Sequence, residues 1–264
     1  MNTNYETIQL ELKGNIAVLT VSREKSLNAL NLQVHTELKA CLSLLKKNED
    51  KLQGLILTGA GDKAFIAGAD IVEMSKMSPQ EAFDFATLGQ EVSLLFEELP
   101  FPVIACVNGF ALGGGCEMAM SCDFIYATET AMFGQPEVKL GLIPGFGGTQ
   151  RLSKLIGRNR AKELIYTGRN VKVDEAKALG LVVKVFDTKD ELLSAAITTL
   201  DKIGANSPMA ISAAKHVMNE GNDLTIAEGL KVEASSFGDI FGTDDMIEGT
   251  VAFIEKRKAN FKAS

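Results

Sequence analysis

The pattern of apolar and polar positions predicts alternating strands and helices in the first part of the chain. Residues 8–12 and 16–22 are apolar or alternate around Lys13-Gly14-Asn15, which is typical of two strands joined by a tight turn. Residues 31–47 carry apolar side chains at helical spacing, and the apolar stretch 54–58 predicts a buried strand. This order predicts a parallel pair of strands with a helical crossover.

The same order continues toward the middle of the chain. We expect a helix after Pro79, strands at 103–107 and 124–127, and a short helix from about Gly114. Residues 181–186 predict a last strand. The pattern therefore indicates an α/β layered core in residues 1–190.

The remainder of the chain has helical spacing throughout. Helices are expected at residues 192–203, 208–219, 224–237 and 244–258. No linker rich in Pro, Gly or Ser separates them from the core. We therefore expect residues 191–264 to pack on the core or on a neighbouring subunit, not to form an independent domain.

The net charge and the cysteine spacing restrict the partners and the cellular compartment that we expect for the protein. The net charge is −7, with 27 Lys and Arg against 34 Asp and Glu, so we expect no nucleic-acid partner. The cysteines have no C-x-x-C spacing and are expected to be buried, reduced thiols: Cys41, Cys106, Cys116 and Cys122. The uncharged run at residues 101–116 is too short to span a membrane, and the first residues have no apolar signal core. We expect a cytoplasmic protein without a membrane partner.

The sequence lacks the residues that several common kinds of catalytic or binding site require. The only histidines, His35 and His216, lie in predicted amphipathic helices, where each is expected to have a surface or helix-face role. Two histidines leave no metal site built from several histidines. No nucleophile elbow and no P-loop is present. Gly145-Phe146-Gly147-Gly148 lacks the third glycine of a dinucleotide fingerprint.

Glycines and carboxylates remain as candidates. Gly113, Gly114 and Gly115 follow the strand at 103–107 and begin a helix, where exposed backbone N–H groups can hold an oxyanion. A second loop, residues 64–70, follows the strand at 54–58 and opens into a short helix at about Ile71. Two loops at the carboxyl ends of parallel strands can aim two donors at one oxygen atom.

Two glutamates accompany these loops. Glu117 follows the glycines by about one helical turn, and Glu137 follows Pro136. In one apolar pocket, one carboxyl tends to keep its proton while the other acts as a base. Alternatively, Glu117 is an ordinary helix-start residue and Glu137 a solvated loop charge.

Five segments together resemble the enoyl-CoA hydratase (crotonase) family, and above all its short-chain hydratases. The match extends over nearly the whole chain and includes these segments: KSLNAL at 25–30, LTGAGDKAFIAGADI at 57–71, PVIACVNGFALGGGCEMAMSCD at 102–123, FGQPEVKLGLIPGFGGTQRL at 133–152 and FGTDDMIEGTVAFIEKRKANF at 241–261.

The resemblance implies a crotonase-like fold of repeated ββα units, whose C-terminal helices form trimers and usually hexamers. It implies a trans-2-enoyl-CoA substrate whose thioester oxygen accepts hydrogen bonds from the N–H groups of Ala69 and Gly114. Glu117 would deprotonate the water that attacks C3, and Glu137 would protonate C2. No cofactor is implied, because coenzyme A is part of the substrate.

The resemblance also assigns positions along coenzyme A. At Val72, related hydratases commonly carry lysine, so a phosphate contact there is not expected. Lys256 has the alternative of a solvated helix end. The positions matched are Lys25, Ser26, Leu27, Ala67, Asp70, Ile71, Val72, Phe237 and Lys256.

Other reactions on this fold stay open at this point. The family includes isomerases, which generally need only the carboxylate at Glu137, and other acyl-CoA enzymes. A non-catalytic acyl-CoA-binding scaffold would lack one glutamate or show a basic face. The presence of both Glu117 and Glu137 favours hydration.

Overall fold

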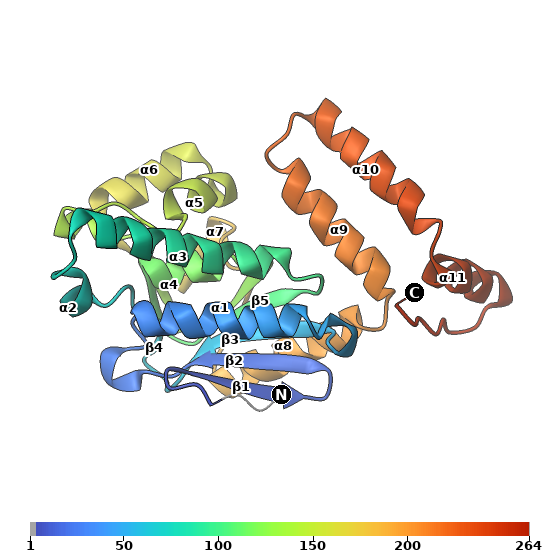
Figure 1. Ribbon diagram of the computed structural model, residues 1–264, viewed down its shortest axis with the longest axis horizontal. Helices are drawn as coiled ribbons and strands as arrows, with labels where there is room; N and C mark the ends of the chain where they lie inside the picture. Colours follow the sequence, from blue (N-terminus) through green and yellow to red (C-terminus); the bar gives the residue numbers. More distant parts are fainter. Residues whose placement is uncertain (1–3, 264) are drawn as a thin grey trace.

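The computed structural model describes residues 4–263, and a six-stranded sheet runs through their centre (Figure 1). Strand β1 pairs antiparallel with β2, and all other neighbours are parallel, including β2 with β3 as predicted. The strands are, in spatial order, β1 (Ile8–Lys13), β2 (Ile16–Val21), β3 (Gly54–Gly59), β5 (Val103–Val107), β7 (Phe124–Thr128) and β10 (Lys184–Phe186).

A second, four-stranded sheet was not predicted from the apolar pattern, but it supplies the second strand of the repeated ββα units that the resemblance implies. Its strands are β4 (Ala64–Ile66), β6 (Phe110–Leu112), β8 (Met132–Gly134) and β9 (Asn170–Lys172). Each of β4, β6 and β8 directly follows a strand of the first sheet, so the chain repeats strand, short strand and helix. The prediction of a loop at residues 64–70 was wrong for the segment of β4, and no strand was expected at β6, because three residues are too few for a periodic signal.

Seven α-helices precede β10 in the described part of the chain. They are α1 (Leu32–Lys46), α2 (Ile71–Met74), α3 (Pro79–Glu98), α4 (Gly114–Met120), α5 (Gly148–Ile156), α6 (Arg158–Thr167) and α7 (Val173–Ala178). Helix α1 begins where the Asn31 side chain accepts the Val34 N–H, and α3 begins with a capping box formed by Ser78 and Glu81. Figure 1 shows α1 and α3 lying side by side over the sheet.

The opposite face of the sheet is covered by α8 (Lys189–Ile203). Its buried residues Leu192, Ala196 and Leu200 recur every four positions and pack on side chains of β2, β3 and β5. This helix of the predicted C-terminal region therefore packs on the core.

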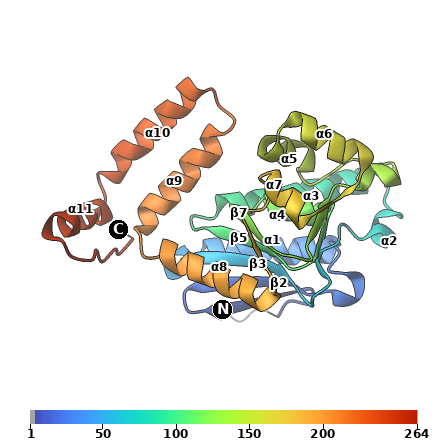
Figure 2. The ribbon, with the colours of Figure 1, turned by 180° about the vertical axis from the view of Figure 1, so that it is seen from behind.

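The last helices stand beside the core as an extension (Figures 1 and 2). Helices α9 (Pro208–Gly221) and α10 (Ile226–Ile240) pair with each other, and α11 (Asp244–Glu255) follows. Neither α9 nor α10 buries a residue. Lys215 connects α9 to the core, because its Nζ donates to the carbonyls of Phe96 and Phe101 at 3.1 Å and to Asp123 Oδ2 at 2.9 Å.

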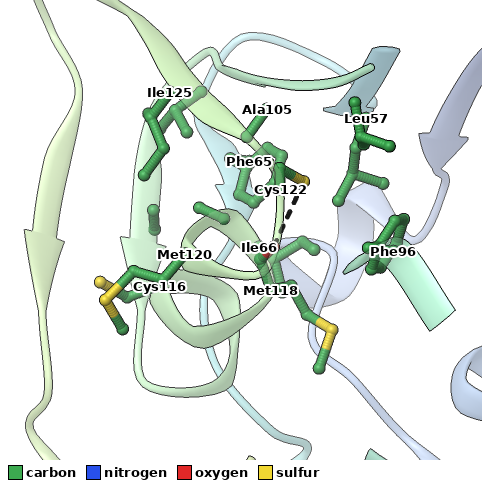
Figure 3. Close-up of a cluster of buried hydrophobic side chains, with 14 of the residues drawn as sticks. Leu57, Phe65, Ile66, Phe96, Ala105, Cys116, Met118, Met120, Cys122 and Ile125 are labelled. Atoms are coloured by element: carbon green, nitrogen blue, oxygen red, sulfur yellow. Dashed lines mark hydrogen bonds between the residues drawn. The ribbon is translucent and has the colours of Figure 1, made fainter. Parts of the chain in front are cut away.

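All four cysteines are buried and unpaired, as predicted. Figure 3 shows Cys116 and Cys122 among the apolar side chains of the core, where Cys122 Sγ contacts the Met118 carbonyl. Burial raises the pKa of the Cys116 thiol to about 12, so it stays protonated at neutral pH. Within residues 4–263, no helix combines the length and the apolar character that a membrane crossing requires.

Candidate active site

A cavity of about 710 Å³ lies between α3, α4, the loop after β4 and the segment that leads into α5. Its wall is mostly apolar, and Glu117 and Glu137 are its only ionisable lining residues. Ala69 and Gly114 line the same cavity. The structure therefore brings together the two glutamates and the two amide groups that the sequence analysis singled out.

Helix α4 places Glu117 in this cavity because its first residues are glycines. Gly113 has φ of +50°, and a Cβ on Gly114 would lie 2.8 Å from the Phe146 ring. A Cβ on Gly115 would overlap with the Ile66 carbonyl of β4. Any side chain at these positions would push α4 away from β4 and from the Phe146 loop.

Two backbone amides hold Glu117. Its Oε1 accepts hydrogen bonds from the N–H of Phe146 at 2.8 Å and of Gly148 at 2.6 Å. Oε2 accepts no hydrogen bond from the described residues, which leaves it for the cavity. Burial raises the pKa of Glu117 to about 7, while the two amides and the charge of Arg151 act in the opposite direction.

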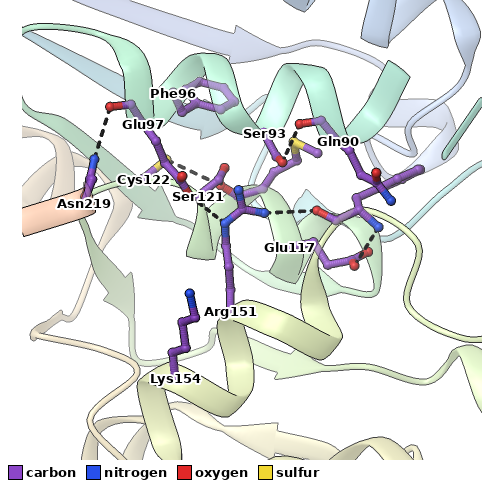
Figure 4. Close-up of polar contacts among 12 residues, drawn as sticks. Gln90, Ser93, Phe96, Glu97, Glu117, Ser121, Cys122, Arg151, Lys154 and Asn219 are labelled. Carbon is purple, nitrogen blue, oxygen red and sulfur yellow. Dashed lines mark hydrogen bonds and ion pairs between the residues drawn. The ribbon is translucent and has the colours of Figure 1, made fainter. Parts of the chain in front are cut away.

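Arg151 supports the loop that carries these amides. Its Nε donates to Glu97 Oε1 at 2.6 Å and its Nη1 to the Phe146 carbonyl at 3.2 Å. Figure 4 shows the Arg151 side chain with Glu97 on one side and Glu117 on the other. The guanidinium thus anchors the Phe146 loop to α3.

Glu137 begins the short 3₁₀ helix Glu137–Leu140 after Pro136. Its Oε2 is buried and has no hydrogen-bond partner among the described residues. Burial, followed by the nearby charge of Glu117, raises the pKa of Glu137 to about 7. Glu137 is therefore not a solvated loop charge, and near neutral pH its carboxyl is poised between the protonated and ionised forms.

Neighbouring backbone hydrogen bonds orient the N–H group of Ala69, and the start of a helix orients that of Gly114. Leu30 donates to the Gly68 carbonyl at 2.8 Å and accepts from the Asp70 N–H at 2.7 Å, which makes a parallel bridge around Ala69. In such a bridge the N–H of the central residue turns away from the partner strand. Gly114 is the first residue of α4, where an N–H has no acceptor within the helix.

The other matched positions separate into three places. Ala67 and Ile71 line the cavity of the glutamates, whereas Asp70 and Val72 line a second cavity of about 750 Å³. Lys25, Ser26 and Leu27 form the exposed 3₁₀ turn at Glu24–Ser26 and its end; the Leu27 carbonyl accepts from the Ala67 N–H at 3.1 Å. Phe237 and Lys256 lie on α10 and at the end of α11 and line neither cavity.

Asp70 also has a clear structural role. Its side chain accepts the Glu73 N–H at the start of α2 and pairs with Arg23 at 3.1 Å. The carboxylate therefore fixes the loop that carries Ala69.

The Phe146 loop was not among the predicted parts of the site, and one of the two histidines is buried beside it. Gly145-Phe146-Gly147-Gly148 was judged only as a weak dinucleotide motif, yet its amides hold Glu117; a buried glutamate that needs donors was the available signal. A surface or helix-face role was expected for His35; it lies on the buried face of α1, which is directed at α3 and the Phe146 loop. His216 is exposed, as expected.

Within the described residues, no three His, Cys, Asp or Glu side chains are grouped so as to hold a metal ion. The cavity combines two carboxyl groups with a mostly apolar wall.

Comparison with known proteins gives a consistent result over almost the full chain. A family model described as enoyl-CoA hydratase/isomerase matches residues 11–264. A short-chain-enoyl-CoA hydratase of Clostridium acetobutylicum is 49% identical over 249 residues, which cover 94% of this chain and 95% of that protein. A crotonyl-CoA hydratase of Syntrophomonas wolfei is 48% identical over 257 residues, covering 97% and 98%. The crystal structure of an enoyl-CoA hydratase from Bacillus anthracis matches with a TM-score of 0.93 at 39% identity, covering 98% of this chain and 100% of that one.

Proposed function

The chain belongs to the enoyl-CoA hydratase/isomerase family, and from this premise we propose that it catalyses the reversible hydration of short-chain trans-2-enoyl-CoA to 3-hydroxyacyl-CoA. The observation that carries the proposal is the pair of glutamates in one apolar cavity, each with its pKa raised to about 7. The relatives named for short-chain and crotonyl substrates support the choice of substrate.

The proposed reaction uses Ala69 and Gly114 as the oxyanion hole. When water adds to C3, the electron pair of the C2–C3 double bond moves toward the thioester oxygen, which becomes negatively charged. Two backbone N–H groups that line the cavity can stabilise this oxygen. One such donor is worth about a hundredfold to a thousandfold in rate.

The two glutamates then divide the proton transfers. Glu117, whose Oε1 is held by two amides, is the carboxylate: its free Oε2 takes a proton from water as the oxygen bonds to C3. Glu137, whose Oε2 is buried without a partner, is the carboxylic acid and delivers its proton to C2. Water and the two carboxyls supply every proton, so the proposal needs no cofactor.

The test follows the loss of the conjugated-thioester absorbance of crotonyl-CoA in water. We expect rapid loss with the wild type and a decrease in kcat of at least about a hundredfold in both Glu117→Gln and Glu137→Gln, the usual range for a positioned acid or base. Glu11→Gln, at an exposed position of β1, is the matched control and should be unchanged. Because one carboxyl must be ionised and the other protonated, kcat/KM should be bell-shaped with its maximum near neutral pH.

Three results would contradict the proposal. If the wild type leaves crotonyl-CoA unchanged, the chain is not a hydratase of this substrate. If it moves the double bond of a 3-enoyl-CoA, and only the Glu137 substitution stops it, the protein is an isomerase. Tight binding of acyl-CoA without turnover would instead identify a non-catalytic scaffold.

We further propose that coenzyme A runs along Lys25, Ser26, Leu27, Ala67, Asp70, Ile71 and Val72. Phe237 and Lys256 would reach it from an adjacent subunit of a trimer or hexamer, since on their own chain they line neither cavity. Exposed apolar side chains on α10 and α11 support such an assembly, among them Ile226, Phe237, Phe253 and Ile254. The unpaired thiols support a reducing compartment such as the cytoplasm.

A further inference from the structure

The Arg151 guanidinium lies where α3, the start of α5 and the Phe146 loop meet (Figure 4). Its side chain is only 15% exposed, and it does not line the cavity of the glutamates. Neither the proton transfers nor the oxyanion hole of the proposed reaction uses it. Taking a cation out of water costs free energy, so the contacts that Arg151 makes at this position must offset that cost.

Arg151 holds Gly147, the residue between the two amide donors of Glu117. The Arg151 backbone N–H donates to the Gly147 carbonyl at 2.9 Å, and its Nη1 donates to the Phe146 carbonyl at 3.2 Å. The guanidinium covers Gly147 so closely that a Cβ there would overlap with it. The N–H groups of Phe146 and Gly148, on either side of Gly147, donate to Glu117 Oε1. Displacement of the guanidinium would therefore move the peptide groups that hold Glu117.

Glu97, in the last turn of α3, fixes the guanidinium in turn. Its Oε1 accepts from Arg151 Nε at 2.6 Å. Helix α9 holds this turn of α3, because Asn219 Nδ2 donates to the Glu97 carbonyl at 3.2 Å and Lys215 Nζ donates to the Phe96 carbonyl at 3.1 Å. Carbonyls of a last helical turn have no partner within their own helix. The contacts from α9 thus fix the part of α3 that positions Arg151.

The charge of Arg151 favours the ionised form of Glu117. Burial raises the pKa of Glu117 to about 7, while the two amides and the Arg151 charge lower it. Both side chains are largely removed from water, so salt screens this attraction little. The other charged groups here are negative: Glu137, from the 3₁₀ helix, shares the cavity, and Glu97, from α3, pairs with Arg151.

We propose that Arg151, held by Glu97, is a positioning residue that makes Glu117 the base of the glutamate pair, by fixing the Phe146 loop and by keeping the Glu117 carboxylate ionised. The inference rests on the proposed function, in which Glu117 takes a proton from water. The two carboxyls share one cavity, and the cation acts on only one side of it. Glu117 experiences the positive charge of Arg151, whereas Glu137 experiences the negative charge of Glu117. This asymmetry favours the proton on Glu137.

The experiment measures kcat and kcat/KM for crotonyl-CoA against pH in wild type, Arg151→Gln and Arg151→Lys. Activity should decrease at low pH as Glu117 takes up a proton. Without the cation Glu117 takes it up at higher pH, so the acidic limb should move up by about one pH unit in Arg151→Gln. Arg151→Lys keeps the charge but lacks the planar fork, so its acidic limb should stay in place while kcat falls about tenfold to a hundredfold.

Lys154→Gln is the matched control. Lys154 is a cation on the same helix, and its ion pair with Asp223 is exposed. Neither its acidic limb nor its kcat should differ from the wild type. If Arg151 only anchored the loop, both Arg151 variants would lose kcat and keep the acidic limb of the wild type. That result would overturn the inference.

The titration of Glu117 provides a second readout that does not depend on turnover. In Glu137→Gln protein, Glu117 is the one carboxyl left in the lining of the cavity. Its protonation is followed by the infrared C=O absorption that disappears when Glu117→Gln is added. Adding Arg151→Gln should raise the midpoint by about one pH unit, and adding Arg151→Lys should leave it unchanged.

This readout separates the inference from the proposed reaction. An unchanged midpoint with Arg151→Gln would overturn the inference, even if the wild type hydrates crotonyl-CoA. A raised midpoint with no hydration by the wild type would retain the effect of Arg151 on Glu117 and reject the proposed reaction.

Discussion

At the scale of single residues, His35 departs most from ordinary protein chemistry. It is fully buried between the rings of Phe85 and Phe146, and neither of its ring nitrogens has a hydrogen-bond partner among the described residues. Burial lowers the pKa of His35 to about 4, from an ordinary value of 6.5. Between these two pH values the unfolded chain binds more protons than the folded one, so this residue reduces stability as the pH falls from 6.5 toward 4.

We predict that His35→Leu removes this loss. The difference in unfolding free energy, variant minus wild type, should be about 2 kcal/mol more favourable to the variant at pH 5 than at pH 7. Urea unfolding of both proteins at the two pH values measures this change. The contributions of carboxyl groups that titrate alike in both proteins cancel when the two differences are compared. His216→Leu, at an exposed position, should show no such change. Equal pH dependence in wild type and His35→Leu would refute the prediction.

At the scale of elements, the start of α4 is the part of the fold that function depends on most. The helix carries Gly114 at its first position and Glu117 about one turn later, and both residues line the cavity. It can do so only because Gly115 lets it touch the Ile66 carbonyl of β4. The second sheet thus sets the position of the catalytic groups in the proposed mechanism.

Gly115→Ala should therefore damage stability and activity together. The added methyl group meets backbone that cannot move away, so we expect a loss of about 1–3 kcal/mol in unfolding free energy. Displacement of α4 should lower kcat/KM for crotonyl-CoA about a hundredfold. Gly14→Ala, in the open turn between β1 and β2, is the control: its positive φ should cost about 1–2 kcal/mol with activity retained. A folded Gly115→Ala protein with full activity would show that α4 tolerates the shift.

At the scale of the whole molecule, the chain divides into a packed core and an extension made of α9, α10 and α11 (Figure 2). The side chains of Phe253 and Ile254 on α11 are 85% and 77% exposed in the single chain. Such a set of large apolar groups is typical of a surface that a second protein chain covers.

We predict that the double substitution Phe253→Glu with Ile254→Glu lowers the oligomeric state. Charges placed in an apolar interface lose their hydration without gaining a partner, which opposes association. The mass in solution, measured by light scattering during size-exclusion chromatography, should fall toward the 28.3 kDa of one chain. Leu12→Glu, on the edge strand β1, should leave the mass unchanged. A wild type that is itself monomeric, or a double variant with unchanged mass, would contradict the assembly proposed here.

The elements that could be predicted from the sequence are those long enough to show apolar spacing. Strands such as β3 and β5 and helices such as α1 and α3 were predicted correctly, because their apolar spacing is a local property of the chain. The pairing of β2 with β3 followed from the order of elements. The strands of the second sheet are too short to carry such a pattern, and helices α5 to α7 were not predicted.

For the candidate site, the groups that can react are evident from the sequence: Glu117 in an apolar segment, the glycines before it, and Glu137 after Pro136. The fold was needed to show that the Phe146 and Gly148 amides hold Glu117, that His35 is buried, and that Phe85 lines two cavities. These contacts join residues that lie far apart along the chain. Residue type and spacing set local conformation and chemical character, whereas burial and partners come from contacts between segments such as α1, α3 and the Phe146 loop, which leave no local pattern in the sequence.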